Sequence, residues 1–312
     1  MRGLSTAPLQ ALTLLAASSL PRMAVSFTTS APSSRPAFAT RMHQSSSSTS
    51  TDYGLGMDQQ AMMESDMLVV VDEEDRLVDS DVVVSKKQAH TFDASQPRGI
   101  CHRAFSLFIF NPEGEMLLTQ RAASKITFPS VWTNTCCSHP LVGMTPNEVD
   151  DPATAYPQFD GIKHAAIRKA KHELGITTLQ HDKIQFVSRF HYWASDTQTH
   201  GPQAPWGEHE VDYILFCQME EPALNPDPEE VANAKYVSIE ELKAMMQDPQ
   251  NIWSPWFLGI MERGGFDWWA DLKNSLEGKN TNMDVTFFDP DPAFVAEYNL
   301  PSHTRTTGVV SR

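Results

Sequence analysis

The sequence predicts a mixed α/β (α+β) fold, in which a sheet of mixed strands is flanked by helices. Three observations predict it. Short segments that alternate apolar and polar residues, or are rich in β-branched residues, recur between residues 67 and 217 with turn residues between them. One segment among them, 161–174, has apolar residues at helical spacing. No internal repeat divides the sequence, so we expect a single sheet-containing domain.

The first predicted strands precede that helix. Residues 67–71 are apolar and run into an acidic turn, and residues 81–85 have the composition of a hairpin partner. The segment 102–110 alternates, which predicts that Arg103 and Phe105 lie on one face of the sheet and His102 on the other. An Asn-Pro-Glu-Gly turn follows it, and residues 115–121 form the returning strand.

The helix 161–174 is the clearest single element. Ile162, Ala166 and Leu174 belong to its apolar stripe, and Gly175 is placed to end it in the left-handed conformation. Beyond it, the pattern predicts two more strands and two more helices. These are strands at 186–193 and 211–217, a helix at 239–246 after the Ser238 cap, and a helix within 261–276.

The bulk composition excludes several classes of protein. With 312 residues and 41% hydrophobic residues, the chain has ample material for a core. Its net charge of −15 argues against nucleic acid as a partner. The four cysteines are too few and too irregularly spaced for a disulfide framework, which favours a reducing compartment. No segment approaches the roughly 18 apolar residues that a membrane span needs.

The amino-terminal region differs from the rest in composition. The first fifty residues hold four arginines and many Ser, Thr and Ala, but no Asp, Glu or Lys. This is typical of an organelle transit peptide, although the apolar stretch 9–20 also suits a signal segment and the whole region suits simple disorder. We therefore expect a transit peptide and Ser/Thr-rich linker at 1–60, a catalytic domain at 61–278 and a loosely attached tail at 279–312. The expected location is the plastid, with the mitochondrion or cytosol as alternatives.

Two carboxylates and three histidines are candidate metal ligands. Glu208 and Glu210 lead into a predicted strand two residues apart, so both point to one face. Carboxylates held side by side favour a shared metal or one raised pKa, and the alternative is a solvated strand edge. His90, His102 and His139 lie near strand starts or turns. Each alone is as well explained as a structural histidine, but together the five suit a divalent ion such as Zn²⁺, Mn²⁺ or Mg²⁺.

The segment 133–140, Thr-Asn-Thr-Cys-Cys-Ser-His-Pro, is a candidate reactive site. Adjacent cysteines rarely bond to each other, because the disulfide would be strained. A functional thiol two residues before His139 is therefore plausible. Basic residues follow the strand before it: Arg121 and Lys125 lie four residues apart, with Lys86 earlier in the chain. They suit a polyanion such as a diphosphate, and the alternative is scattered surface charge.

Lys169 and Glu173 lie four residues apart in the helix. They suit a surface ion pair, and Glu173 equally suits a bridge to phosphate through Mg²⁺.

From about residue 67 to 272 the chain resembles the type 1 isopentenyl-diphosphate isomerases, which have a Nudix-like fold. That resemblance implies a mixed-sheet sandwich flanked by helices. Its most specific segments are TNTCCSHP and GEHE, which occur here in the family's order. The matching stretches are HRAFSLFIFN from His102, QRAASKITFPSVWTNTCCSHPL from Gln120, AAIRKAKHELGI from Ala165, WGEHEVDYILF from Trp206 and NPDPEEV from Asn225.

The resemblance implies a reaction and a role for each matched residue. The double bond of isopentenyl diphosphate moves, by protonation to a tertiary carbocation and deprotonation elsewhere, to give dimethylallyl diphosphate for isoprenoid biosynthesis. Cys137 and Glu210 match the acid–base pair, and Trp256 matches the tryptophan that faces the cation. The diphosphate-binding positions match Lys86, Arg121, Lys125, Ser138 and Lys169. The metal ligands match His90, His102, His139, Glu208 and Glu210, with Glu173 reaching the diphosphate through Mg²⁺.

One departure separates the chain from the Nudix hydrolases. Their helix pattern places glutamates where this sequence has Lys169 and His172, although Arg168 and Glu173 are kept. The loss of metal-binding carboxylates disfavours diphosphate hydrolysis. A Nudix hydrolase of a diphosphate compound and a non-catalytic diphosphate-binding module are the alternatives. We expect a monomer whose partner is a small isoprenyl diphosphate.

Overall fold

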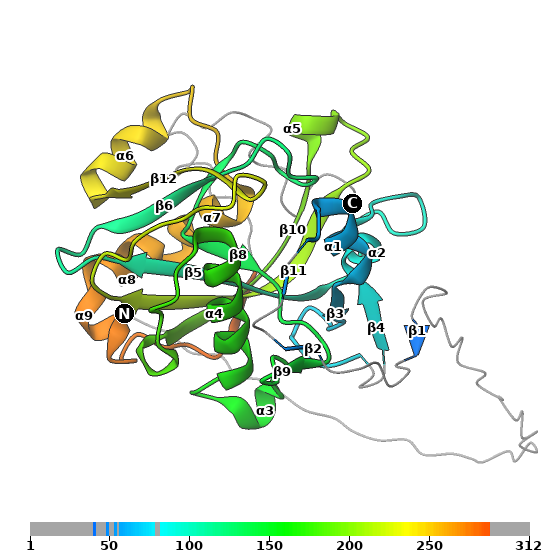
Figure 1. Cartoon of the computed structure of the whole chain (residues 1–312), viewed down its shortest axis with the longest axis horizontal. Helices are drawn as coiled ribbons and strands as arrows, with labels where there is room; N and C mark the ends of the chain where they lie inside the picture. The colour runs from blue at the N-terminus through cyan, green and yellow to red at the C-terminus, as the bar shows by residue number, and fades with distance from the viewer. Residues whose placement is uncertain (1–39, 42–47, 50–52, 55, 79–81, 288–312) are drawn as a thin grey trace, which may run out of the picture. The chain divides into compact units, whose positions relative to one another are not determined.

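The computed structural model describes residues 40–41, 48–49, 53–54, 56–78 and 82–287 (Figure 1). Its main element is a mixed sheet in the order β12-β6-β5-β11-β10-β13, with β7 paired to β6 and β8 to β5. The strands are β5 (His102–Phe110), β6 (Met116–Arg121), β7 (Trp132–Thr133), β8 (Cys136–Ser138), β10 (Gln185–Ser195), β11 (Gly207–Gln218), β12 (Val231–Val237) and β13 (Val285–Phe287).

Two small sheets and a set of helices complete the described residues. The predicted hairpin is confirmed, since β3 (Met67–Val69) pairs antiparallel with β4 (Val82–Ser85). The other short strands are β1 (Thr40–Arg41), β2 (Ser48–Thr49) and β9 (Met144–Thr145). The helices are α1 (Gln59–Ser65), α2 (Lys86–His90), α3 (Pro152–Ala155), α4 (Asp160–Leu174), η1 (His181–Lys183), α5 (Thr197–His200), α6 (Ile239–Gln247), α7 (Pro255–Ile260), η2 (Met261–Gly265), α8 (Phe266–Ala270) and α9 (Leu272–Leu276).

The sheet is covered by helices on both faces, as Figure 1 shows, which makes a three-layer α/β sandwich. On one face, Phe105 and Leu215 pack with Ile162 and Leu174 of α4. On the other face, side chains of the same strands pack with α6, α7 and α8. Both faces of β5 are covered, because every one of its residues is buried. The predicted mixed fold is confirmed.

The neighbours of β11 determine which side chains meet. β11 pairs parallel with β5, which places Glu210 opposite His102. It pairs antiparallel with β10, which places Tyr192 opposite Glu210. Residues directly opposite each other point to the same face of a sheet. Glu210, His102 and Tyr192 therefore lie on one face, together with residues two positions along each strand.

Helix α4 agrees closely with its prediction. It begins at Asp160 and ends at Gly175, whose φ of 69° is left-handed and whose amide donates to the carbonyls of Ala170 and Lys171. A residue with a Cβ would be strained there, and its Cβ would approach Asn225 to 2.9 Å. Ten residues of the helix are buried, so packing fixes its position.

The segment 261–276 is helical, as predicted, but it forms three short helical segments rather than one helix. The segment divides into η2, α8 and α9, with Gly264 at φ 146° inside the π-helical turn. Trp268 occupies the space beside Gly264, at 2.8 Å from where a Cβ would lie. The helix pattern breaks there because this conformation is accessible to glycine alone. Trp269 is buried, as expected for the packed side.

The folded region extends further than 61–278 at both ends. Before residue 61, Tyr53 stacks on Arg168 at 4.2 Å and donates a hydrogen bond to Asp66. After residue 278, Val285–Phe287 pairs with β10 as an edge strand, so this part of the expected tail is attached to the sheet. Residues 288–312 of the predicted tail, and residues 1–39, 42–47, 50–52 and 55 of the predicted transit peptide and linker, lie outside the described residues. Among those described, no helix is long and apolar enough to cross a membrane.

Candidate active site

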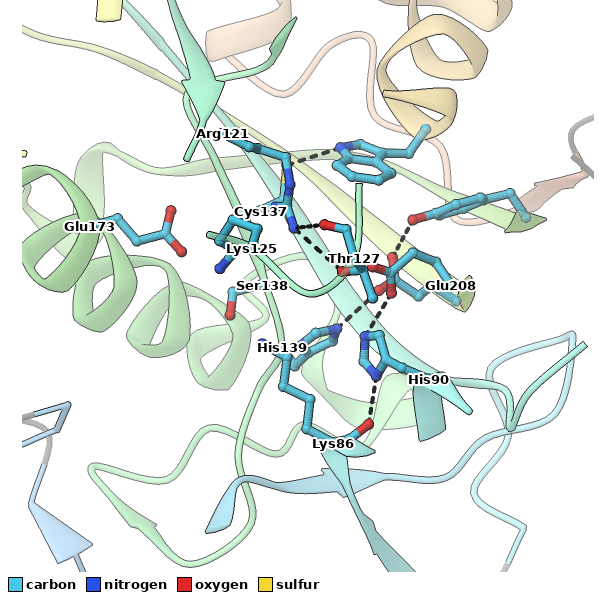
Figure 2. Close-up of a pocket in the computed structure, with 13 residues that line it drawn as sticks. Lys86, His90, Arg121, Lys125, Thr127, Cys137, Ser138, His139, Glu173 and Glu208 are labelled. Atoms are coloured by element: carbon cyan, nitrogen blue, oxygen red, sulfur yellow. Dashed lines mark hydrogen bonds and ion pairs between the residues drawn. The ribbon is translucent and has the colours of Figure 1, made fainter. Parts of the chain in front are cut away.

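A pocket opens where α2, β8 and β11 converge (Figure 2). Most of the residues predicted for the site line it, although they come from segments more than a hundred positions apart. Its space, counted with its mouth, is about 400 Å³. The lining residues are Lys86, His90, Arg121, Lys125, Thr127, Cys137, Ser138, His139, Glu173, Tyr192, Glu208, Glu210 and Trp256.

The three histidines and two glutamates predicted as metal ligands form one cluster. One ligand atom from each of His90, His102, His139, Glu208 and Glu210 lies within 4.8 Å of all the others. His90 Nε2 lies 2.6 Å from a Glu208 oxygen, and His139 Nε2 lies 3.0 Å from a Glu210 oxygen. All five residues are buried. The alternative of a solvated strand edge is therefore excluded for the two glutamates.

The hydrogen bonds of the histidines fit a cation at the centre of this cluster. Nδ1 of His90 donates to the Lys86 carbonyl and Nδ1 of His102 to the Ile100 carbonyl, each at 2.7 Å. The tautomer that makes these bonds leaves a lone pair on each Nε2. In this tautomer Nε2 of both histidines and Oε2 of Glu208 are all acceptors, so His90 Nε2 and Glu208 Oε2 face each other at 2.6 Å and no hydrogen bond is made to any of the three atoms. A divalent ion satisfies such acceptors, so the residues present fit a metal.

The charges in the cluster also suit metal ligands. Burial, followed by the neighbouring His102 and His90, lowers the pKa of His139 well below its usual value. Its imidazole is therefore neutral and able to coordinate. Burial acts to raise the pKa of Glu210, but His102 and the Tyr192 hydroxyl outweigh it and hold that pKa below its usual value. Glu210 is thus a carboxylate.

A raised carboxyl pKa occurs one step further along β11, at Asp212. Burial, followed by the charge of Glu210, raises the pKa of Asp212 well above its usual value. Its Oδ2 accepts a hydrogen bond from the Ser106 hydroxyl at 2.7 Å. The sequence left open whether side-by-side carboxylates on this strand share a metal or have a raised pKa. Both occur on this face of β11: Glu208 and Glu210 belong to the metal-ligand cluster, and Asp212 has the raised pKa.

Cys137 lies at the floor of the pocket among hydrogen-bonding groups. Its thiol donates to Oδ1 of Asn134 at 2.9 Å, and Nε1 of Trp256 donates to its sulfur at 3.1 Å. Burial, followed by the charge of Asp212, raises the pKa of Cys137 to about 12. The group is therefore a protonated thiol, which is suited to proton transfer rather than to nucleophilic attack.

The segment before Cys137 holds β8 in place. Asn134 donates to the carbonyls of Leu107 and Cys136, and the Thr135 hydroxyl donates to the Leu117 carbonyl at 2.7 Å. These bonds join the segment to β5 and β6. Cys136, the adjacent cysteine, points the other way, and its thiol donates to Glu173 at 3.3 Å. Only Cys137 of the pair lines the pocket.

Trp256 is positioned by the start of α7. Ser254 caps this helix and Pro255 occupies its first turn, which suits a residue with no amide hydrogen. The ring of Trp256 meets Phe128 edge-on at 5.5 Å, and the Arg121 guanidinium lies 5.5 Å from its centre. Arg121 also donates to the carbonyls of Thr127 and Phe128. The aromatic wall and the cationic group are thus held together.

The predicted lysines Lys86 and Lys125 line the same pocket as Arg121. Lys86 and His90 lie four residues apart on α2, so both reach the pocket from one helix face. Burial, with the charges of Lys125 and Lys169, lowers the pKa of Lys86 to about 8. Lys125 forms an ion pair with Glu230. The positive charges of Lys125 and Lys169 lower the pKa of Lys86. This concentration of positive charge indicates that an anion would bind favourably beside these lysines.

Lys169 lies behind the pocket rather than in its lining. Its Nζ is 3.0 Å from Glu173 and 3.5 Å from Glu230, and its side chain is 2% exposed. The interpretation of Lys169 and Glu173 as a surface pair is therefore wrong. Burial under Tyr53, which lies 5.5 Å above Lys169, makes this pair part of the interior. Glu173 faces the pocket, as Figure 2 shows.

Sequence reasoning missed several residues of the site. Tyr192 donates to Oε2 of Glu210 at 2.6 Å, and Glu230 contacts two of the lysines. Arg168 donates to the His139 carbonyl at 2.9 Å while it is paired with Glu148. If the predicted strands 186–193 and 211–217 had been paired antiparallel in the correct register, Tyr192 would have been recognised as the neighbour of Glu210. Arg168 is one of the kept residues of the Nudix helix pattern, and Glu230 lies in the matched stretch NPDPEEV, so both carried a signal in the sequence.

Comparison with known proteins identifies the class. A NUDIX domain model matches residues 101–257. The isopentenyl-diphosphate delta-isomerase of Schizosaccharomyces pombe is 41% identical over 243 residues, which are 77% of this chain and 98% of that protein. The chloroplastic isopentenyl-diphosphate delta-isomerase 1 of Cannabis sativa is 38% identical, over 72% of this chain and 75% of that protein. This NUDIX-domain chain belongs to the isopentenyl-diphosphate delta-isomerase family.

Proposed function

We propose that this chain interconverts isopentenyl diphosphate and dimethylallyl diphosphate by protonation and deprotonation, and so supplies isoprenoid biosynthesis. The observation that supports this most directly is a protonated thiol, Cys137, and a carboxylate, Glu210, that line one pocket. Moving an unactivated double bond needs a proton donor and a proton acceptor on either side of a small alkene. The names of the relatives support the same substrate.

The diphosphate is proposed to bind at the basic side of the pocket. Lys86, Arg121 and Lys125 supply positive charge there, and the Ser138 hydroxyl supplies a further hydrogen bond. Glu173 reaches the same space and is proposed to hold a Mg²⁺ ion against the diphosphate. Lys169 is proposed to act at longer range, since Glu173 and Glu230 separate it from the pocket.

The five-carbon chain then extends between Cys137, Glu210 and Trp256. One member of the acid–base pair gives a proton to the alkene, and the other removes a proton from a different carbon of the resulting cation. The Tyr192 hydroxyl orients the Glu210 carboxylate. The face of Trp256 stabilises the tertiary cation through its π electrons, and the buried aromatic walls exclude water that would capture it.

His90, His102, His139, Glu208 and Glu210 are proposed to hold one further divalent ion, Zn²⁺, Mn²⁺ or Mg²⁺. When bound, such an ion supplies positive charge that fixes Glu210 and tunes its acidity. The orphaned acceptors described above support this assignment.

The structure around α4 favours isomerisation over hydrolysis. Lys169 occupies a position of a hydrolase glutamate and places its ammonium 3.0 Å from Glu173. A cation at that position competes with the metal ions that activate water in a hydrolase.

One assay tests the proposal directly. Purified protein stripped with EDTA and supplied again with Mg²⁺, Mn²⁺ or Zn²⁺ is incubated with isopentenyl diphosphate in D₂O. We expect metal-dependent formation of dimethylallyl diphosphate and deuterium incorporation, followed by NMR. Phosphate release without rearrangement would identify a hydrolase, and binding with neither change would identify a non-catalytic module.

We also propose import into the plastid and action as a monomer. The acid-free, arginine-containing first fifty residues support import. Residues 1–60 fused to a fluorescent reporter should accumulate in plastids, and a mitochondrial or cytosolic signal would contradict this. Sedimentation equilibrium of the purified chain checks the monomer, and a concentration-dependent rise in mass would contradict it.

A further inference from the structure

A second group of metal-binding side chains lies on the face of the sheet opposite the pocket. Cys101, His191 and His209 each offer one ligand atom, and these atoms lie within 4.8 Å of one another. Side chains alternate between the two faces along a strand. Each of the three therefore adjoins a residue that faces the pocket, and the adjoining pairs are Cys101–His102, His191–Tyr192 and His209–Glu210.

The geometry of the two histidines suits a tetrahedral ion. Their Nε2 atoms are 3.1 Å apart, and each residue is 5% exposed. Zinc–nitrogen bonds of about 2.0–2.1 Å at a tetrahedral angle place two nitrogens about 3.3 Å apart. Cys101 is partly buried as a residue, and all three ligand positions of the cluster are buried. Its sulfur lies 3.9 Å from the Asp72 carbonyl oxygen.

We propose that Cys101, His191 and His209 bind a divalent ion of the zinc class, at a site separate from the His/Glu cluster of the pocket. One thiolate and two imidazoles select Zn²⁺ over Mg²⁺, because sulfur is a soft ligand. Binding releases the thiol proton to solvent as the sulfur–metal bond forms. A water molecule completes the four-coordinate shell. The ion joins the ends of β10 and β11 to the start of β5, directly behind the residues that form the active site.

Cobalt substitution of the full-length protein separates this site from the other. The His/Glu cluster has only nitrogen and oxygen ligands, so it gives no sulfur-to-cobalt absorption. Co²⁺ added to the metal-free wild type should produce a thiolate charge-transfer band in the near ultraviolet. The Cys101→Ser variant should lose this band and one equivalent of bound zinc. Cys217→Ala, which removes a buried thiol elsewhere on β11, should keep both.

A second substitution keeps the test decisive if Cys101→Ser does not fold, as judged by circular dichroism. His191→Gln should weaken zinc binding at this site by more than about 100-fold, the largest loss typical of outer-shell changes. The proposal is overturned if the wild type shows no thiolate band, or if the band persists in both variants. It is also overturned if Cys137→Ala removes the band, since that assigns the sulfur to the pocket.

Discussion

Glu210 and Asp75 are two buried carboxylates whose partners lie on opposite faces of β11. Asp75 is 1% exposed and is completely matched by cations and donors. Arg103 Nε donates to it at 2.9 Å, Arg189 Nη1 at 2.7 Å, and the Tyr213 hydroxyl also donates to it. Glu210 is 6% exposed and receives its hydrogen bonds from Tyr192 and from a histidine, with no arginine or lysine.

The difference separates a structural carboxylate from the one that we propose to act in catalysis. Two guanidinium groups neutralise Asp75, so removal of that charge leaves them buried and unpaired. Glu210 instead lies among groups that can exchange protons or accept a metal, beside buried acceptors with no partner. Burial alone therefore does not indicate function, and the chemistry of the partners does.

The largest expected effect tests the functional side of the comparison. Glu210→Gln and Cys137→Ala should each lower kcat by about 10²–10⁴-fold, because each removes one proton-transfer group. The urea midpoint should stay close to that of the wild type, since both substitutions nearly preserve the packing. Cys217→Ala is the matched control, because it removes a buried thiol that does not line the pocket. Turnover retained by metal-loaded Cys137→Ala would contradict the role of Cys137.

For the structural carboxylate, Asp75, we expect the opposite result, which is a loss of stability with little change in kcat. Asp75→Asn should lower the free energy of unfolding by about 3–5 kcal/mol, because two buried guanidinium groups lose their counter-charge. At low temperature, kcat should remain close to that of the wild type. Urea unfolding and steady-state kinetics on the same preparation make the comparison. A stable but inactive Asp75→Asn protein would remove the distinction between the two carboxylates.

Arg121 tests whether the basic side of the pocket acts in binding. Arg121→Ala should raise KM by about ten- to hundredfold, the value of one charge-assisted hydrogen bond, with a smaller change in kcat. Lys273→Ala, at an exposed position of α9, is the charge-matched control and should leave KM unchanged. A fall in kcat with KM unaltered would instead place Arg121 in the chemical step.

The smallest effect concerns pH. Because the pKa of Lys86 is lowered to about 8, this lysine is charged below that pH and loses its charge above it. If the charged form alone binds diphosphate, KM should rise about tenfold between pH 7 and pH 9. Lys86→Arg keeps its charge throughout this range and should flatten the profile. An equal rise of KM in the Lys86→Arg protein would assign the effect to another group.

Local sequence patterns predicted the individual strands and helices better than they predicted which strands and side chains contact each other. Alternation along 102–110 placed Arg103 and His102 on opposite faces, and Gly175 ended its helix as expected. The hydrogen bond between Tyr192 and Glu210 needed the register of β10 against β11, which no local pattern contains. The break at Gly264 depended on how Trp268 packs, which is a tertiary effect.

The same limit applies to the candidate site. The metal-binding residue types and the thiol were recognisable from the sequence, because their chemistry is specific. The burial of Lys169 was not recognisable from the sequence, because it depends on contacts with Tyr53 and Glu230. Those two residues lie far from Lys169 in the sequence, one in a segment that reads as a linker. Composition there indicated low complexity and gave no sign of a packed ring.

The contact between Tyr53 and α4 constrains how the chain is matured. Tyr53 covers Arg168 and Lys169, and Gly54, with φ +78°, lies so close to His172 that a Cβ would approach its ring to 2.3 Å. A protease that removed residues through 54 would expose the buried lysine and loosen the diphosphate side of the pocket. If the proposed leader is removed, we expect the cut to fall before Tyr53, so that the processed chain still contains this residue.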